Sequence, residues 1–138
     1  MTEAELQSQV ADYLRFRYPS VLFHSDFGSG VKLTMGQAIR QKRQNGGRRA
    51  WPDMFIAHPN CYENCGADIW THGLFIELKR EGTRIRKKNG EFASEHIKEQ
   101  WEILGALTLR GYKAEFACGF DEAKKLIDDY LGGTDENR

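Results

Sequence analysis

The sequence predicts an α/β domain in which helices flank a small mixed β-sheet, and three observations support this fold class. Helical periodicity alternates with short apolar runs, no internal repeat or linker interrupts the chain, and 40% of the residues are hydrophobic, which excludes a disordered chain. A length of 138 residues is enough for one core and too short for two ordinary domains. Residues 1–138 are therefore predicted to form a single domain, with 132–138 as a frayed tail.

The first half of the chain is predicted to contain two helical segments and two strands. In order, these are a helix over 3–18, a strand over 21–24, a helical piece near 34–44 and a strand over 54–57. Leu6, Val10 and Leu14 recur at helical spacing in the first of them, which Thr2 can cap and Pro19 ends. The rest of 25–51 is rich in Gly, Lys, Arg and Gln and is predicted to be a long loop, which in a compact domain is usually functional.

The second half is predicted to complete the sheet and its covering helices. In order, it holds a loop or hairpin end over 58–71, a strand over 74–78, a turn at 89–90, a helix over 94–110, a strand over 112–118 and a helix over 121–131. Ser94 caps the long helix and Gly111 ends it. Its spacing predicts that Trp101 belongs to the buried face, and Cys118 is expected in the core.

The charge of the chain is zero overall but is unevenly distributed. Residues 1–26 hold four acids and two bases, 27–90 hold twelve bases and five acids, and 91–138 hold six bases and eleven acids. Net zero charge argues against a nucleic-acid partner, whereas a basic central block indicates a phosphate-binding surface. The residues predicted to hold DNA phosphates are Lys32, Arg40, Lys42, Arg43, Arg48, Arg49, Arg84, Arg86, Lys87 and Lys88.

Three charged residues at the ends of two apolar strands form the candidate catalytic group. Asp53 follows Pro52 at the start of one strand, and Glu77 and Lys79 lie at the end of another. Because side chains alternate along a strand, Glu77 and Lys79 project on the same face. Two nearby carboxylates repel each other unless a cation lies between them, and Mg²⁺ prefers such oxygen ligands. An isolated Glu-x-Lys triplet is usually an exposed ion pair, so it is the combination that predicts a metal site.

These residues resemble the PD-(D/E)-x-K motif of nucleases with the restriction-endonuclease-like fold, and in detail the virus-type replication–repair nuclease domain, VRR-Nuc. That family has a Glu in the first helix, a Gly-rich approach to the Pro-Asp pair, a Glu-x-Lys strand and a Gln on the following helix. Glu3, Gly46-Gly47 and Gln100 match the elements outside the strands. The resemblance extends from about residue 3 to about residue 118 and implies a restriction-endonuclease-like core.

The resemblance also implies a metal-dependent phosphodiesterase that acts on DNA with Mg²⁺, or with Mn²⁺ in its place. The implied metal ligands are Asp53, Glu77, the backbone carbonyl of Leu78 and Glu3, with Lys79 as catalytic lysine and Gln100 orienting the lysine or the scissile phosphate. A helix drawn at 100° steps places Glu3 about 60° from Leu6 and Glu5 about 100° to the other side. This favours Glu3 as the helix acid, with Glu5 kept as the alternative.

Stand-alone members of the family resemble Holliday-junction resolvases and form homodimers. The resemblance therefore implies a homodimeric, structure-selective DNA endonuclease of phage or bacterial type, acting on branched DNA in the cytoplasm. A flap, end-processing or nicking nuclease and a non-catalytic DNA-binding accessory protein stay open as alternatives. No apolar run is long enough to span a membrane, and three cysteines favour a reducing compartment.

A second possible metal site lies in the predicted hairpin region. His58, Cys61, Cys65 and His72 have a spacing that could bind zinc. The two ligand pairs flank predicted strands, and motifs of this kind often arise by chance, so an insertion loop with two ordinary thiols is favoured.

Overall fold

The structure is a computed structural model that describes residues 1–26, 32–48, 50–64 and 67–132, with the backbone alone in 61–64 and 67–69. Four strands form a mixed sheet in the order β1-β2-β5-β6. Their bounds are Phe23–Ser25 for β1, Met54–Ile56 for β2, Leu74–Lys79 for β5 and Lys113–Cys118 for β6. β1 pairs antiparallel with β2 and β2 with β5, whereas β5 and β6 are parallel. The sheet is therefore small and mixed, as predicted.

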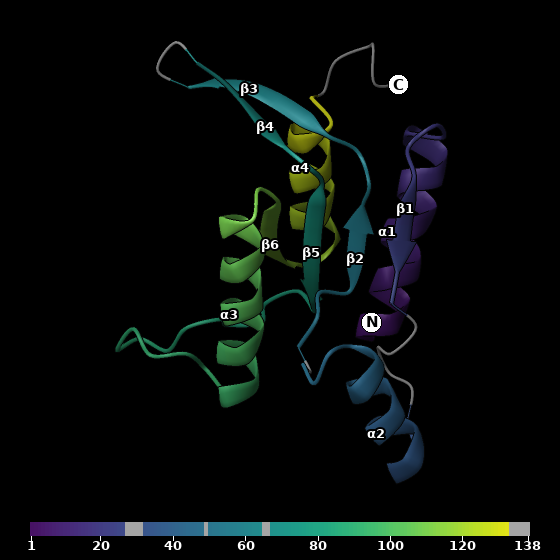
Figure 1. Cartoon of the computed structure of the whole chain (residues 1–138), viewed down its shortest axis with the longest axis vertical. Coiled ribbons are helices and arrows are strands. Elements are labelled where there is room, and N and C mark those ends of the chain that lie inside the picture. The colour runs from purple at the N-terminus through teal and green to yellow at the C-terminus, as the bar shows by residue number, and fades with distance from the viewer. Residues whose placement is uncertain (27–31, 49, 65–66, 133–138) are drawn as a thin grey trace.

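A separate hairpin and four helices complete the described chain (Figure 1). The hairpin strands are β3 (Asn60–Asn64) and β4 (Ala67–Thr71), and the helices are α1 (Glu3–Arg17), α2 (Met35–Gln44), α3 (Glu95–Leu109) and α4 (Phe120–Tyr130). Each predicted strand and helix is present, with ends that differ by one or two residues. The predicted loop or hairpin end over 58–71 is a hairpin of two five-residue strands.

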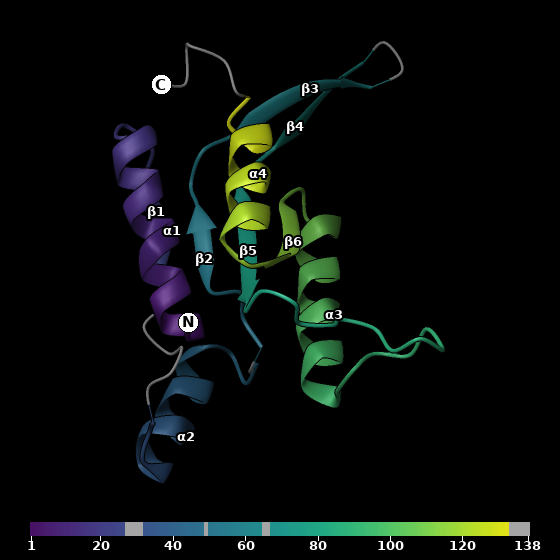
Figure 2. The ribbon, with the colours of Figure 1, turned by 180° about the vertical axis from the view of Figure 1, so that it is seen from behind.

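The two faces of the sheet are covered by different helices. Ile76 and Leu78 of β5 belong to the main core, together with apolar side chains of α1 and α4. Phe75 packs on the opposite face with Ile103 and Leu107 of α3. Figure 2 shows α4 crossing in front of β5 on the side away from the viewer in Figure 1. Alternation along β5 thus directs its odd-numbered residues towards α3.

Three of the four described helices begin at a capping side chain, whereas α4 begins after Gly119 without one. Thr2 and Glu5 form a reciprocal capping box at the start of α1, and Thr34 and Gln37 form another at the start of α2. The Ser94 hydroxyl accepts a hydrogen bond from the Ile97 amide at 3.1 Å and so caps α3. Unlike the other helices, α2 has no buried residue.

Two predictions about the core are wrong. Trp101 is 47% exposed, because the buried face of α3 is made by Gln100, Leu104 and Leu107 and neighbouring residues, which lie to one side of the predicted stripe. Cys118 is only half-buried, and its thiol contacts the Thr83 carbonyl at 3.6 Å. Of the predicted tail 132–138, residues 133–138 lie outside the described chain. Among the described helices, none is long and apolar enough to cross a membrane.

Candidate active site

Asp53 and β5 meet where one ladder of the sheet ends. The β2–β5 ladder ends at the pair Met54 and Ile76, whereas the parallel ladder with β6 continues to Lys79. Past that point the Asp53 carboxylate takes the place of a strand partner, because its Oδ2 accepts a hydrogen bond from the Leu78 amide at 2.8 Å. A residue in an extended strand directs its N–H and C=O to the same side. The Leu78 carbonyl therefore leaves β5 on the side of Asp53.

Glu77 and Lys79 lie together on the α3 face of β5. Both side chains are buried, with residue exposures of 4% and 7%, and Lys79 Nζ lies 3.8 Å from Glu77 Oε1. Their neighbours Ile76 and Leu78 fill the core on the other face. The structure therefore brings Asp53, Glu77 and Lys79 together at one end of the sheet.

Gln100 of α3 completes the surroundings of Glu77. Its Nε2 donates a hydrogen bond to Glu77 Oε1 at 2.8 Å, and the glutamine itself is 5% exposed. Glu77 Oε2 and Gln100 Oε1 are buried and accept no hydrogen bond from an N–H or hydroxyl donor of the described chain, so a proton shared with Asp53 is what Glu77 has in the absence of a cation. Unsatisfied buried oxygens are costly, and a hard cation that binds oxygen would satisfy the carboxylate. The donor set therefore fits a divalent cation such as Mg²⁺.

Burial and mutual repulsion raise the pKa of both acids. The pKa of Glu77 is raised to about 10, first because burial disfavours its charge and second because Asp53 is a neighbouring carboxylate. Burial likewise raises the pKa of Asp53, although the hydrogen bond from the Leu78 amide acts in the opposite direction. The Lys79 ammonium lowers both pKa values and only partly offsets these effects. Without a cation, the pair therefore retains a proton at neutral pH.

Glu3 and Glu5 differ in what their side chains contact. Glu3 lines the same cavity as Asp53 and Glu77, and its charge raises the pKa of both. The Glu5 carboxylate accepts a hydrogen bond from the Thr2 amide at 2.9 Å within the capping box. Of the two candidate acids, Glu3 is the one at the site.

A cavity of about 780 Å³ opens over these residues between the sheet, α2 and α3. Several of its lining residues were not predicted as site residues, among them Asp26, Trp51 and His96. Helical spacing could have identified His96, which precedes Gln100 by one turn. Asp26 could not be found in this way, because it reaches the site through a backbone hydrogen bond to Asp53 of 2.7 Å. A cavity of about 830 Å³ beside Arg80 and Gly119 contains none of the motif residues.

The described chain contains no group of three His, Cys, Asp or Glu side chains already spaced to hold a metal. Mg²⁺ usually takes one or two carboxylates and retains several waters, so Asp53 and Glu77 are sufficient protein carboxylates for it. Glu3 lies at the same cavity without joining them in a preformed cluster. The fit therefore rests on two carboxylates and the Leu78 carbonyl.

The predicted phosphate-binding residues lie in several different places in the structure. Lys42 and Arg48 line the cavity, so they lie at the site. The exposed residues Lys32, Arg40 and Arg43 lie just before or on α2, and Arg84, Lys87 and Lys88 are exposed in the segment between β5 and α3. Arg86 instead contacts aromatic rings of the protein, and Arg49 lies outside the described residues.

The possible zinc set as a whole lies outside the described residues, because Cys65 and the side chain of Cys61 are not described. The His72 ring packs edge-on against Tyr112 at 5.5 Å between centroids. It also fills the space beside Gly111, where a Cβ atom would lie 2.8 Å from the ring. His72 therefore has a packing role of its own.

Comparison with known proteins identifies the fold. No protein-family model matches the sequence, and no curated protein matches it. Among solved structures, the chain is similar to one described as a "VRR_NUC domain protein", with a TM-score of 0.60, 22% identity and coverage of 94% of this chain and 88% of that chain. The chain therefore has the restriction-endonuclease-like fold of a VRR_NUC domain protein, which is the fold class that the sequence predicted.

Proposed function

We propose that the protein is a divalent-metal-dependent endonuclease that hydrolyses phosphodiester bonds in DNA. The observation that carries this proposal is the buried Glu77 carboxylate, which has one oxygen without an N–H or hydroxyl donor in the described chain and lies between Lys79 and Asp53 in a cavity lined by Lys42 and Arg48. Maintaining two acids beside a buried lysine costs stability, so a functional role explains them better than a structural one. The fold of the VRR_NUC domain protein gives independent support.

Each residue of the site has a distinct task in this proposal. A bound divalent cation would lower the pKa of an attacking water and stabilise the charge on a phosphate oxygen. Asp53 and Glu77 would hold it, with the Leu78 carbonyl directed to the same side. Gln100 fixes the orientation of Glu77 through Oε1 and leaves Oε2 for the ligand role. Lys79 would position the attacking water or neutralise negative charge as the transition state forms.

The same proposal extends to substrate and assembly. Basic residues on α2 and in the segment after β5 would contact phosphates without reading bases, which suits recognition of DNA shape. We propose a branched or otherwise structured substrate, with resolution of four-way junctions by a homodimer as the specific form.

The test uses end-labelled four-way junctions, flaps and linear duplexes with Mg²⁺ or Mn²⁺. Wild-type protein is expected to cut, and Asp53→Ala and Lys79→Ala are each expected to lose at least about 100-fold in rate. Lys113→Ala is the matched control, because Lys113 lies at the opposite end of the sheet in an exposed pair with Glu115. The proposal fails if wild type cuts no substrate with either metal, or if the two site variants cut as fast as the control.

The assembly is tested separately by measuring the mass of the native particle at micromolar concentration. Twice the chain mass is expected for a junction-resolving enzyme, since two sites must face two strands. A monomer that still cuts flaps or nicks duplex DNA would support the proposed nuclease activity and would contradict the proposal that a homodimer resolves four-way junctions.

A further inference from the structure

The segment between β5 and α3 contains a short ordered hairpin, residues 84–93, called here the basic hairpin. Arg86 and Phe92 form an antiparallel bridge, and Ala93 donates a backbone hydrogen bond to Ile85 at 2.9 Å. Lys87 N donates to the Glu91 carbonyl at 2.7 Å, and Gly90 N donates to the Lys87 carbonyl at 3.0 Å. Gly90 has a φ of +89°, which a residue with a side chain rarely adopts. This is a tight turn whose loop ends in a left-handed glycine.

Arg86 holds this hairpin against α3. Its guanidinium carbon lies 4.0 Å from the centroid of Phe92 and 5.7 Å from that of Trp101, and the two rings lie 5.3 Å apart. The same guanidinium donates a hydrogen bond to the Gly90 carbonyl at 2.8 Å. Arg86 is therefore committed to cation–π and backbone contacts within the protein. These contacts also explain why Trp101 lies outside the core.

Lys87 and Lys88 lie at the turn of the basic hairpin, and Arg84 lies at its base. All three are exposed, and within the described chain none has a carboxylate at ion-pair distance. A flexible loop loses conformational entropy when it becomes ordered on binding. The turn that carries these lysines is already ordered, so binding through it costs less conformational entropy. The chemistry that matches two adjacent ammonium groups is a polyanion with closely spaced charges.

The position of the basic hairpin relates it to the active site. It starts five residues after Lys79, which is the last residue of β5, and Figure 1 shows this segment extending beyond α3 on the side opposite to α2. The reverse view in Figure 2 shows the same arrangement. α2 borders the cavity directly, so a phosphate backbone held there is flanked by two basic elements on opposite sides.

We infer that the basic hairpin is a second DNA-contacting element, which binds the phosphate backbone of duplex DNA outside the catalytic cavity. Lys87 and Lys88 make the contact, and Arg86 is a positioning residue that keeps the turn ordered through Phe92 and Trp101. This inference rests on the proposed function for its choice of DNA as the polyanion. It differs from the sequence prediction in that Arg86 does not contact phosphate.

The test measures affinity for a labelled four-way junction without divalent metal, over a series of salt concentrations. Each phosphate contact contributes about 0.9 to the slope of log affinity against log salt. Lys87→Ala/Lys88→Ala is expected to reduce this slope by about 2. Arg86→Met should weaken DNA binding but leave the salt slope unchanged, because Arg86 orders the turn and does not contact phosphate. Trp101→Leu should have the same effect on affinity and slope, although it does not change the charge of the protein. Lys113→Ala/Lys125→Ala removes two charges far from the site and should keep the wild-type slope.

Two results would overturn the inference. A slope for Lys87→Ala/Lys88→Ala equal to that of the control pair means that the basic hairpin does not contact DNA. A slope reduced by about 1 in Arg86→Met means that Arg86 itself contacts phosphate. Because no metal is present, these outcomes are independent of cleavage. If the variants show the expected salt slopes but wild type cuts no substrate, only the proposed function is contradicted. If wild type cuts DNA but the Lys87→Ala/Lys88→Ala slope equals that of the control, only this inference is contradicted.

Discussion

Glu77 is unusual among the described carboxylates, because it is nearly inaccessible to solvent while a second acid lies beside it. The raised pKa of about 10 means that the folded protein without metal binds a proton here that the unfolded chain releases in the usual range near 4.5. A divalent cation can replace that proton without leaving a buried oxygen unsatisfied. Under the proposed function, metal binding, proton release and folding stability are therefore linked at this one residue.

This linkage predicts how stability depends on pH. In EDTA the folded state binds more protons than the unfolded state between pH 4.5 and about 10, so the melting temperature should fall as pH rises through that window. Each ~1 kcal/mol lost lowers the melting temperature by roughly 3 °C in a chain of this size. The increase caused by Mg²⁺ should grow with pH, and Glu77→Gln should flatten both trends. Thermal melts from pH 5 to pH 9 in EDTA and in Mg²⁺ measure these changes, and equal slopes for wild type and variant would contradict the assignment.

Gln100 should affect metal binding through Glu77. Gln100→Ala removes the donor to Glu77 Oε1, so metal affinity or cleavage should fall about 10–100-fold. Glu99→Ala is a control on the exposed side of the same helix. Calorimetric titration with Mn²⁺ measures the affinity. Unchanged affinity together with unchanged cleavage in Gln100→Ala would show that the hydrogen bond does not position the carboxylate.

At the scale of single residues, the positions that could be predicted are those that follow the periodicity of one strand or one helix. Strand alternation placed Glu77 and Lys79 on one face, and helix angles favoured Glu3 over Glu5. Arg86 and Trp101 could not be assigned correctly, because their contact joins a hairpin to a helix across an intervening turn. Helix periodicity alone placed Trp101 in the core. In the structure, Trp101 lies outside the core and packs against Phe92 and Arg86.

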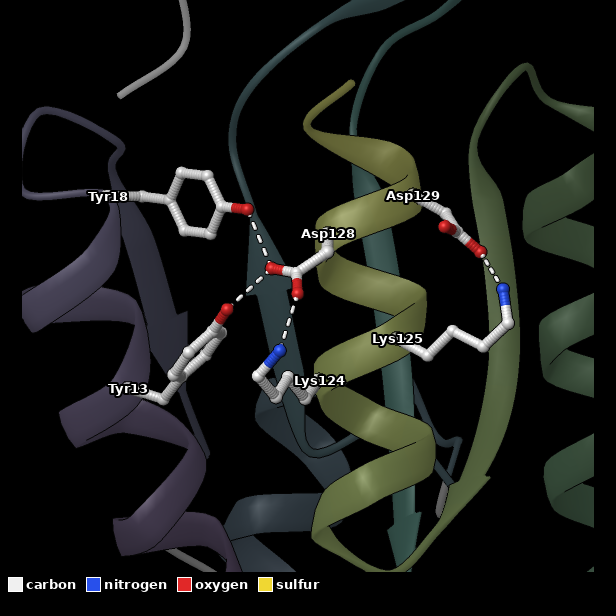
Figure 3. Close-up of polar contacts among 6 residues, drawn as sticks. All are labelled: Tyr13, Tyr18, Lys124, Lys125, Asp128 and Asp129. Carbon is white, nitrogen blue, oxygen red and sulfur yellow. Dashed lines mark hydrogen bonds and ion pairs between the residues drawn. The ribbon is translucent and has the colours of Figure 1, made fainter. Parts of the chain in front are cut away.

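Among the elements, α1 and α4 are joined by a polar cluster that no local pattern reveals. Figure 3 shows the Tyr13 and Tyr18 hydroxyls from α1 and the residue after it meeting Asp128 of α4. Each hydroxyl donates to Asp128 Oδ1 at 2.6 Å, and Lys124 Nζ lies 3.0 Å from Oδ2. Burial opposes the charge of Asp128, but the two tyrosines and Lys124 hold its pKa below the usual range. α1 also carries Glu3, so this cluster helps to fix the helix that borders the site.

Removing one hydroxyl should destabilise the protein measurably. Tyr18→Phe eliminates a hydrogen bond to a charged acceptor from a side chain that is 1% exposed, so unfolding should require about 1.5–3 kcal/mol less. The pKa of Asp128 is lowered on folding, so the cluster stabilises the fold fully above pH 3.8 and loses its effect as acid protonates Asp128 below that. Urea unfolding at pH 7 and pH 3 measures both effects. Lys125→Ala is the control, because it removes an exposed ion pair with Asp129, and its free energy of unfolding should equal that of wild type at both pH values. A Tyr18→Phe variant as stable as wild type would contradict the role of the cluster.

The types of the elements could be predicted more readily than their ends and partners. Thr2 and Ser94 were predicted to cap helices through their side chains, and each does so. Ser25 extends β1 beyond its predicted end because it pairs with Met54, and such pairing partners are distant in sequence. The strand order of the sheet was outside the reach of periodicity for the same reason.

Across the whole molecule, neutral net charge conceals a separation of charge around the site. Basic side chains of α2 and the basic hairpin flank the cavity, and the acids of 91–138 lie mainly in α3 and α4. Affinity for DNA should therefore fall by more than about tenfold between roughly 50 mM and roughly 200 mM salt. Fluorescence anisotropy with a labelled junction measures this dependence. Affinity that stays constant over that range would indicate that the basic elements do not bind phosphates.

The separation of α2 from the core has a consequence for how this protein can change over time. α2 is helical and capped, yet none of its residues is buried, and it forms one wall of the cavity. Substitutions on α2 therefore alter what the cavity admits without altering the packing that holds the sheet together. Because most substitutions in a folded domain carry a stability cost, an element without such a cost is free to diversify. If the proposed function holds, substrate preference can thus drift, or be engineered, through this one helix while the strands that carry Asp53, Glu77 and Lys79 remain as they are.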